Sequence, residues 1–201
     1  MANTSNPRGF KPVDNLRERG TIGRVGRYLI PSTDGTAVYV GDLVKLAGAA
    51  TAGSGDVTVA QAAAGDTTLI GVVVGIDQVS GISLTSSNLN VNYRPASTAM
   101  YVFVSDDPDT IYEAQVNSVG VTTTHIFVIG DMGENCDVVV AAGNTTTGLS
   151  GMQVDGSSHT TSAKQLRTIK YANPLNEDLT ADLVTLQVMI NQHAYKTTTG
   201  V

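Results

Sequence analysis

Apolar and polar residues alternate in short runs along most of the chain. The runs "YVFVS" (101–105) and "TIYEAQV" (110–116) place apolar side chains at every second position, which is the period of a strand with one buried face. Such runs recur about every ten to fifteen residues, a spacing typical of β-sandwiches and barrels. The segment "LNEDLTADLVTLQVMI" (175–190) is long enough for a helix, but its second half alternates and is rich in β-branched residues, so it predicts a turn followed by a final strand.

The first half of the chain adds two hairpin-like patterns and one continuous apolar run. "GRYLIP" (26–31) and "TAVYVGDLVKLAG" (36–48) are joined through Asp34-Gly35, which is the strongest short hairpin signal in the chain. "LIGVVVGI" (69–76) is apolar without alternation. It therefore predicts a strand buried on both faces, with a bend or bulge at its glycines.

Polar segments separate these strands. A further strand is expected at "HIFVIG" (125–130), a loop or weak edge hairpin at 47–68, and long polar loops at 77–92 and 141–163. The composition agrees with this picture, because 21 glycines, no tryptophan and only 15% charged residues suit an all-β protein with many tight turns. We predict an all-β fold with a β-barrel or β-sandwich body.

The first residues follow neither the strand nor the helix period. Residues 1–24 are interrupted by proline and glycine and predict an extended N-terminal arm, whose order has to come from a partner. Residues 25–201 form the β-rich body, either one barrel or two stacked β modules. Removal of residues 1–20 is therefore expected to leave the body folded.

Charge also divides the chain, a few residues after the end of the arm. Residues 1–28 carry a net charge of +4 and the remainder −10, within an overall −6 at pH 7. This asymmetry predicts a basic arm that pairs with carboxylates of another protein. Nucleic acid is disfavoured as the partner, because the acidic body would repel a polyanion and stacking aromatics are few. No window of 18 apolar residues and no apolar leader are present, so no membrane segment is expected.

The acidic cluster Asp106, Asp107 and Asp109 is the first candidate for chemistry. It lacks the glycine, the ligand spacing and the closing glutamate of a calcium loop. Asp before Pro108 is favoured in a turn, so we predict a corner between two strands, with a contact to a partner subunit or a metal site as alternatives. A hydrolase that uses these aspartates is a further alternative.

No other pattern predicts catalysis, a metal or a cofactor. His125, His159 and His193 are far apart in sequence and form no ligand pair of the H-x₃-H kind. Cys136 has no adjacent base, which indicates a structural thiol. The serine and glycine motifs miss the spacing of nucleophile elbows and phosphate loops. We therefore expect a protein that is not an enzyme.

Six segments together resemble a known family of structural proteins. They are "MANTSNPRGFKPV" (1–13), "RYLIPSTDGTAVYVGDLVKLAG" (27–48), "VAQAAAGDTTLIGVVVGI" (59–76), "YRPASTAMYVFVSDDPDTIYEAQ" (93–115), "DVVVAAGNTTTGLSGMQVD" (137–155) and "LRTIKYANPLNED" (166–178). With these segments the chain resembles the capsid cement, or decoration, proteins of tailed bacteriophages. The resemblance implies a small homo-oligomer, a dimer or trimer, that sits on the outer capsid surface of the virion and bridges neighbouring major capsid protein subunits.

The expected capsid contacts lie in the arm. Arg8, Lys11, Arg17 and Arg19 would pair with carboxylates, and Phe10 would be an apolar anchor. A carbohydrate-binding or host-surface-binding β module of a virion is the alternative function, suggested by the polar loops. Sugar sites rely on flat aromatic faces, with which this chain is poorly supplied.

Overall fold

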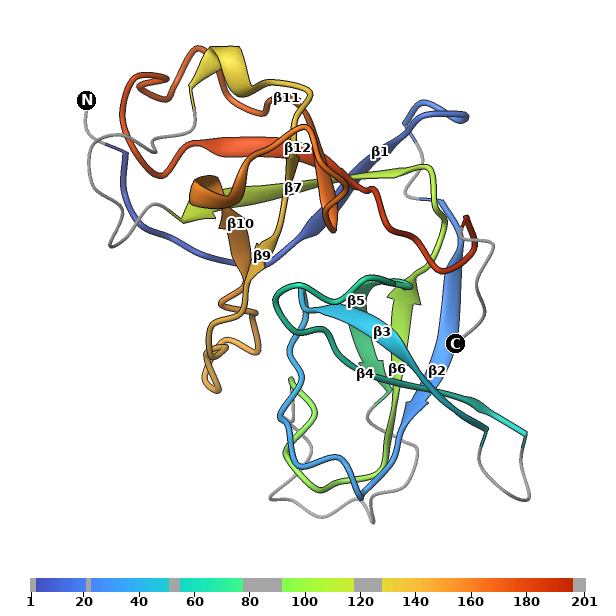
Figure 1. The fold of residues 1–201 in the computed structure, drawn as a ribbon. Coiled ribbons are helices and arrows are strands. Elements are labelled where there is room, and N and C mark those ends of the chain that lie inside the picture. Colours follow the sequence, from blue (N-terminus) through green and yellow to red (C-terminus); the bar gives the residue numbers. More distant parts are fainter. Residues whose placement is uncertain (1–2, 21–22, 51–54, 78–91, 118–127, 197–201) are drawn as a thin grey trace.

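The computed structural model describes residues 3–20, 23–50, 55–77, 92–117 and 128–196, and these fold into two β units (Figure 1). The first is a closed barrel with the strand order β2-β4-β3-β5-β6. Its strands are β2 (Val25–Ile30), β3 (Leu43–Ala50), β4 (Val57–Gln61), β5 (Gly71–Asp77) and β6 (Met100–Ser105). The prediction of an all-β fold is confirmed, and the barrel is one of the two body types expected.

The second unit is a seven-stranded sheet with the order β8-β11-β12-β7-β10-β9, to which β1 adds by pairing with β7. Its strands are β1 (Lys11–Asn15), β7 (Thr110–Asn117), β8 (Asn135–Cys136), β9 (Val138–Val139), β10 (Gln153–Asp155), β11 (Leu166–Tyr171) and β12 (Thr185–Ile190). Two short 3₁₀ turns accompany it, η1 (Ile129–Asp131) and η2 (Gly156–Ser158). The barrel is thus inserted, in chain order, between β1 and β7 of this sheet.

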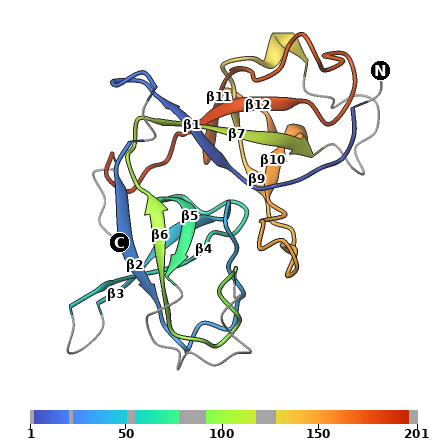
Figure 2. The same cartoon turned by 180° about the vertical axis from the view of Figure 1, so that it is seen from behind.

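The N-terminal strand takes its order from its own chain. β1 runs antiparallel to β7, from Lys11 opposite Glu113 to Asn15 opposite Thr110, and Figure 2 shows β1 lying along β7 above the barrel. Strand pairing supplies backbone hydrogen bonds that an isolated arm would lack. The expectation that residues 11–15 need a partner protein to become ordered is therefore wrong.

Several strand predictions are confirmed. The continuous apolar run became β5, in which Val72 belongs to the core beneath the second sheet and Val73 to the barrel interior. The expected bulge interrupts the β5–β6 pairing between Val73 and Gly75. The alternating run at 183–190 became β12. The small-residue segment at 47–68 contains the end of β3 and all of β4, which pair as expected, but both strands belong to the closed barrel and not to a sheet edge.

The hairpin predicted at Asp34-Gly35 is wrong. β2 pairs with β6 and β4, whereas β3 pairs with β4 and β5, so the two segments flanking this turn do not pair with each other. The turn is organised by Arg94, a fully buried side chain. Its guanidinium donates hydrogen bonds to the carbonyl oxygens of Pro31 at 2.7 Å and Asp34 at 2.9 Å. Because Arg94 holds both carbonyls, the turn keeps its shape without strand pairing.

One predicted strand and one predicted loop lie partly outside the described residues. Of the segment 125–130, residues 128–130 are described, and η1 begins there in place of a strand. Residues 78–91 of the expected loop at 77–92 lie outside the described residues. The segment 141–163 contains β10 and η2 as well as irregular backbone.

Two apolar clusters form the core. One fills the barrel, with Ile30, Val59 and Val102 among its fully buried side chains. The other lies under the second sheet and extends to Leu43 and Val72 of the barrel strands. Since this second cluster draws side chains from both units, it joins the barrel to the sheet.

Candidate functional site

The acidic cluster predicted from the sequence lies where the chain leaves the barrel and enters the second sheet. Residues 106–109 connect the end of β6 to the start of β7, so the prediction of a corner between two strands is confirmed. Asp107 accepts hydrogen bonds from the Asn15 side chain at 3.0 Å and from the backbone N–H of Asp109 at 2.9 Å. These contacts tie the corner to the end of β1.

Asp106 is the buried member of the corner. Its side chain receives two hydrogen bonds from Arg24, at 3.1 and 2.7 Å, and a third from the Tyr28 hydroxyl at 2.6 Å. The Tyr28 hydroxyl also lies 2.8 Å from that of Tyr195. The Asp106 carboxylate raises the pKa of Arg24, while burial and then the Asp106 bond raise the pKa of Tyr28. Both partners therefore keep their protons at neutral pH.

Asp109 joins the two ends of the described chain. Its carboxylate pairs with Arg17 at 2.5 Å and with Lys196 at 2.7 Å. The Lys196 hydrogen bond, together with the charges of Lys196 and Arg17, lowers the pKa of Asp109. An open polar hollow of about 660 Å³ lies beside these side chains. The carboxylates of Asp106, Asp107 and Asp109 each accept hydrogen bonds from side chains or backbone N–H groups. The three aspartates therefore hold neighbouring segments of the chain together.

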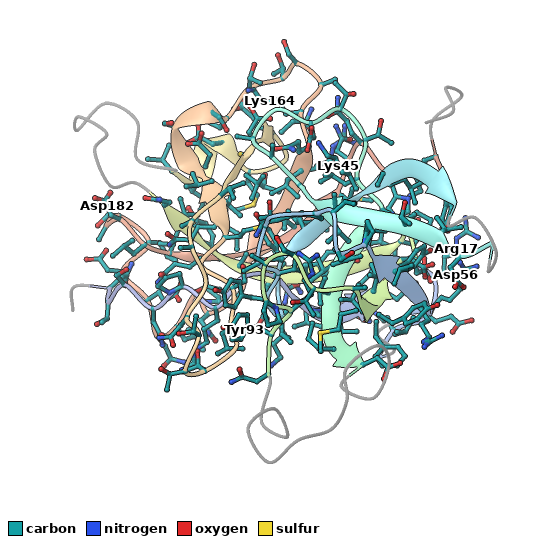
Figure 3. All side chains as sticks on the ribbon, turned by 90° about the horizontal axis from the view of Figure 1, so that it is seen from below. Arg17, Lys45, Asp56, Tyr93, Lys164 and Asp182 are labelled. Atoms are coloured by element: carbon teal, nitrogen blue, oxygen red, sulfur yellow. The ribbon has the colours of Figure 1, made fainter. Side chains whose placement is uncertain are left out.

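The predicted contact residues separate into exposed and buried groups. Arg8, Lys11, Arg17 and Arg19 are exposed, and Figure 3 shows Arg17 at the periphery of the molecule. Phe10 is only 2% exposed and belongs to the core cluster that joins the two units. The expectation that Phe10 anchors a partner is therefore corrected, because its ring already packs inside this chain.

The structure brings Arg8 and Lys11 together on one surface. Both border a hollow of about 570 Å³ that is also lined by Glu113, Gln115 and Glu177. The segment before Phe10 is fixed there, because Gln115 donates to the Thr4 carbonyl at 2.9 Å and accepts from the Asn6 backbone N–H at 2.9 Å. We call the exposed side chains of Arg8 and Lys11, which lie beside Glu113 and Glu177, the N-terminal basic surface.

Closer to the N-terminus, Asn3 binds the loop between β11 and β12. Its side chain donates to the carbonyl oxygens of Asp178 at 3.0 Å and Asp182 at 2.8 Å. Arg17 and Arg19 lie after β1, and of the two Arg17 reaches the acidic corner. The five predicted contact residues therefore do not form one continuous patch.

The cysteine and the histidines occupy different environments. Cys136 is fully buried, and burial raises the pKa of its thiol to about 12, in agreement with the prediction of a structural cysteine. His193 is also fully buried, and burial lowers its pKa to about 4. His125 lies outside the described residues.

Sequence reasoning missed one group of side chains. His159 lies beside Asp131 and Glu134, with its Nδ1 atom 2.9 Å from Glu134 Oε2. The D-x-x-E spacing of the two acids is common in turns, and nothing in the sequence links them to a histidine in a later loop. The fold alone brings them together.

Comparisons with known proteins returned no relatives. No protein family, curated protein or solved structure matches the chain. Among the described residues, no helix has the length and apolar character needed to cross a membrane.

Proposed function

We propose that this chain is a structural virion protein that binds the outer surface of an assembled tailed-phage capsid and cross-links neighbouring major capsid protein subunits. The observation that carries the proposal is the N-terminal basic surface. Arg8 and Lys11 are exposed on a segment whose backbone is held by β7 and whose Phe10 ring is buried. Two cationic side chains on a backbone that is already fixed lose less conformational entropy on docking than a free arm would, which favours their pairing with carboxylates of a protein lattice.

The proposed role depends on many identical contacts with one shell. A shell offers many identical sites, and simultaneous engagement of linked copies raises avidity by roughly 10²–10⁴ over a single contact. A protein that binds the assembled shell in preference to free subunits stabilises the shell by mass action. A dimer or trimer of this chain would present two or three such surfaces to adjacent subunits.

The alternative of a sugar-binding module receives less support from the described aromatic residues. Tyr39 and Tyr93 stack with ring centroids 4.9 Å apart. Tyr39 is only 7% exposed, and a Cβ added at Gly143 would lie 2.3 Å from its ring. A ring covered so closely does not offer the open face that a sugar needs.

The test is a binding experiment with empty shells built from the major capsid protein of the same genome. Purified chain is mixed with shells at low ionic strength, and occupancy is measured by sedimentation and electron microscopy. Deletion of residues 1–20 is unsuitable because it removes Phe10 and β1 from the fold. The variant Arg8→Gln/Lys11→Gln removes two exposed charges and leaves both of these features in place.

We expect the double variant to bind shells at least tenfold more weakly than the unmodified chain, and salt to weaken the unmodified chain further because exposed charges are screened. The matched control is Arg167→Gln/Lys170→Gln, which removes two exposed charges from β11. This control is expected to bind as the unmodified chain does. Failure of the unmodified chain to decorate shells would refute the proposal, and equal loss in both double variants would remove the N-terminal basic surface from it.

A further inference from the structure

Three side chains that can ligate a metal meet at one end of the second sheet. Asp131 ends η1, Glu134 precedes β8, and His159 follows η2. His159 Nδ1 is 2.9 Å from Glu134 Oε2 and 3.7 Å from Asp131 Oδ1, and one ligand atom from each residue lies within 4.8 Å of the other two. We propose that Asp131, Glu134 and His159 bind one divalent transition-metal ion, with Zn²⁺ the preferred ion.

The distances fit a tetrahedral ion. Zn–N and Zn–O bonds of about 2.1 Å at tetrahedral angles place neighbouring ligand atoms about 3.4 Å apart. The two distances to His159 Nδ1, 2.9 and 3.7 Å, lie on either side of that value. All three ligand atoms lie within 4.8 Å of one another, so side-chain rotation of the two carboxylates can bring them to that spacing, with Nδ1 as a deprotonated ligand. Water would complete the coordination.

The backbone holds the three ligands without a metal. Asn135 and Thr160, the residues that follow Glu134 and His159, exchange backbone hydrogen bonds of 2.8 and 2.9 Å. Thr168 of β11 donates from its backbone N–H and from its hydroxyl to the Glu134 carbonyl oxygen, each at 3.0 Å. Two chain segments distant in sequence thus keep their ligands within reach of one another, which lowers the cost of binding an ion.

Charge also favours a cation at this place. Within the described part of the chain, His159 is the ion-pair partner of both Asp131 and Glu134, and neither carboxylate lies within 4.0 Å of a lysine or arginine nitrogen. The nearby Asp137 is already paired with Lys164. Two converging carboxylates that face a single imidazole leave negative charge that a divalent ion would neutralise.

The ligand set selects the kind of ion. Calcium and magnesium prefer oxygen ligands alone, whereas an imidazole nitrogen with two carboxylates suits Zn²⁺ and its first-row neighbours. The side chains of Asp131, Glu134 and His159 are 16, 29 and 23% exposed, so solvent and an ion can reach them. Such an ion would staple η1 to the loop after η2. The proposal does not depend on the capsid role, since the isolated chain can test it.

The experiment measures metal binding by the full-length chain after chelator treatment and dialysis. Isothermal titration with Zn²⁺ is expected to give one ion per chain, and Co²⁺ is expected to show the intense visible absorption of a tetrahedral site. Zn²⁺ is expected to raise the thermal unfolding midpoint, because it binds the folded state. Mg²⁺ and Ca²⁺ at the same concentration are expected to leave the midpoint unchanged.

Substitutions of the proposed ligands test which side chains bind the ion. His159→Gln and Glu134→Gln are each expected to lower Zn²⁺ affinity at least tenfold, and the matched control Asp182→Asn is expected to leave it unchanged. Thermal unfolding without metal shows whether each variant folds, and the two ligand variants give independent readings if one fails. Absence of saturable Zn²⁺ binding by the unmodified chain, or unchanged affinity in folded His159→Gln, would overturn the proposal.

Discussion

Substitution of Phe10 tests whether the N-terminal segment is part of the core. Phe10 is 2% exposed, its backbone N–H donates to the Gly41 carbonyl at 2.9 Å, and the preceding Gly9 has a positive φ of 70°. A Cβ at position 9 would lie 2.5 Å from both Gly41 O and Ser150 Cβ, so the chain enters the core through a passage that only glycine fits. The segment is therefore built into the fold.

The expected magnitude follows from the burial of the ring. Transfer of a fully buried phenylalanine side chain to water costs about 1.5–3 kcal/mol, and the cavity left by alanine raises the total to about 3–5 kcal/mol. Against a typical free energy of unfolding of about 5–15 kcal/mol, Phe10→Ala removes a large share. Phe10→Leu fills most of the space and is expected to cost less than about 2 kcal/mol.

The assay is urea unfolding followed by far-UV circular dichroism and by tyrosine fluorescence, because the chain has no tryptophan. The control is Arg8→Ala, an exposed change two residues away, which should stay within about 0.5 kcal/mol of the unmodified chain. If Phe10→Ala unfolds at the same urea concentration as Arg8→Ala, the segment before β1 does not contribute to the core and the reasoning fails.

Three further predictions concern buried polar groups. Arg94→Lys should lower the free energy of unfolding by about 2–4 kcal/mol, since an ammonium group cannot span the carbonyl oxygens that the guanidinium fork holds; a loss below about 0.5 kcal/mol in urea unfolding would contradict this. Cys136, whose thiol pKa is raised to about 12 by burial, should react with a thiol reagent only after unfolding, and rapid reaction of the native protein would be the opposite result. His193 has a pKa lowered from 6.5 to about 4, so the unfolded state binds its proton first and stability should fall as the pH drops from about 6.5 to 4. His193→Gln should flatten that part of the stability–pH curve, and an unchanged slope would count against the buried neutral imidazole.

The sequence predicted correctly those strands whose own pattern of apolar residues matches the faces that are buried in the fold. The alternation at 183–190 became β12, and the unbroken apolar run at 69–76 became a strand that contributes side chains to both cores. In each case the period of the side chains reports directly which faces are buried. The all-β class followed from the same signals.

The errors arose where distant residues decide the structure. The turn at Asp34-Gly35 has the composition of a hairpin, but Arg94 satisfies its carbonyl groups from far along the chain and its flanking segments pair elsewhere. Phe10 is a single aromatic residue in a segment without a period, so no pattern indicated its burial. Backbone hydrogen bonds and core packing supplied by other segments overrode the local signals.

The candidate sites were still less visible in the sequence. The acidic corner was predicted as a turn, yet its pairing with Arg17 and Lys196 joins opposite ends of the described chain. His159 meets Glu134 only because Asn135 and Thr160 form a bridge. Ion pairs across such separations leave no trace in the sequence spacing, because they depend on how distant segments of the chain pack together.

The insertion of the barrel between β1 and β7 has a consequence for biosynthesis. β1 leaves the ribosome first, but its partner β7 emerges only after the whole barrel, which is continuous in sequence from β2 to β6. The barrel can therefore close during translation while the N-terminal strand waits unpaired, and its closure brings that strand near the emerging β7 at a reduced entropic cost. The last described residues, where Leu69 bridges His193, then attach the end of the chain to a barrel that is already complete.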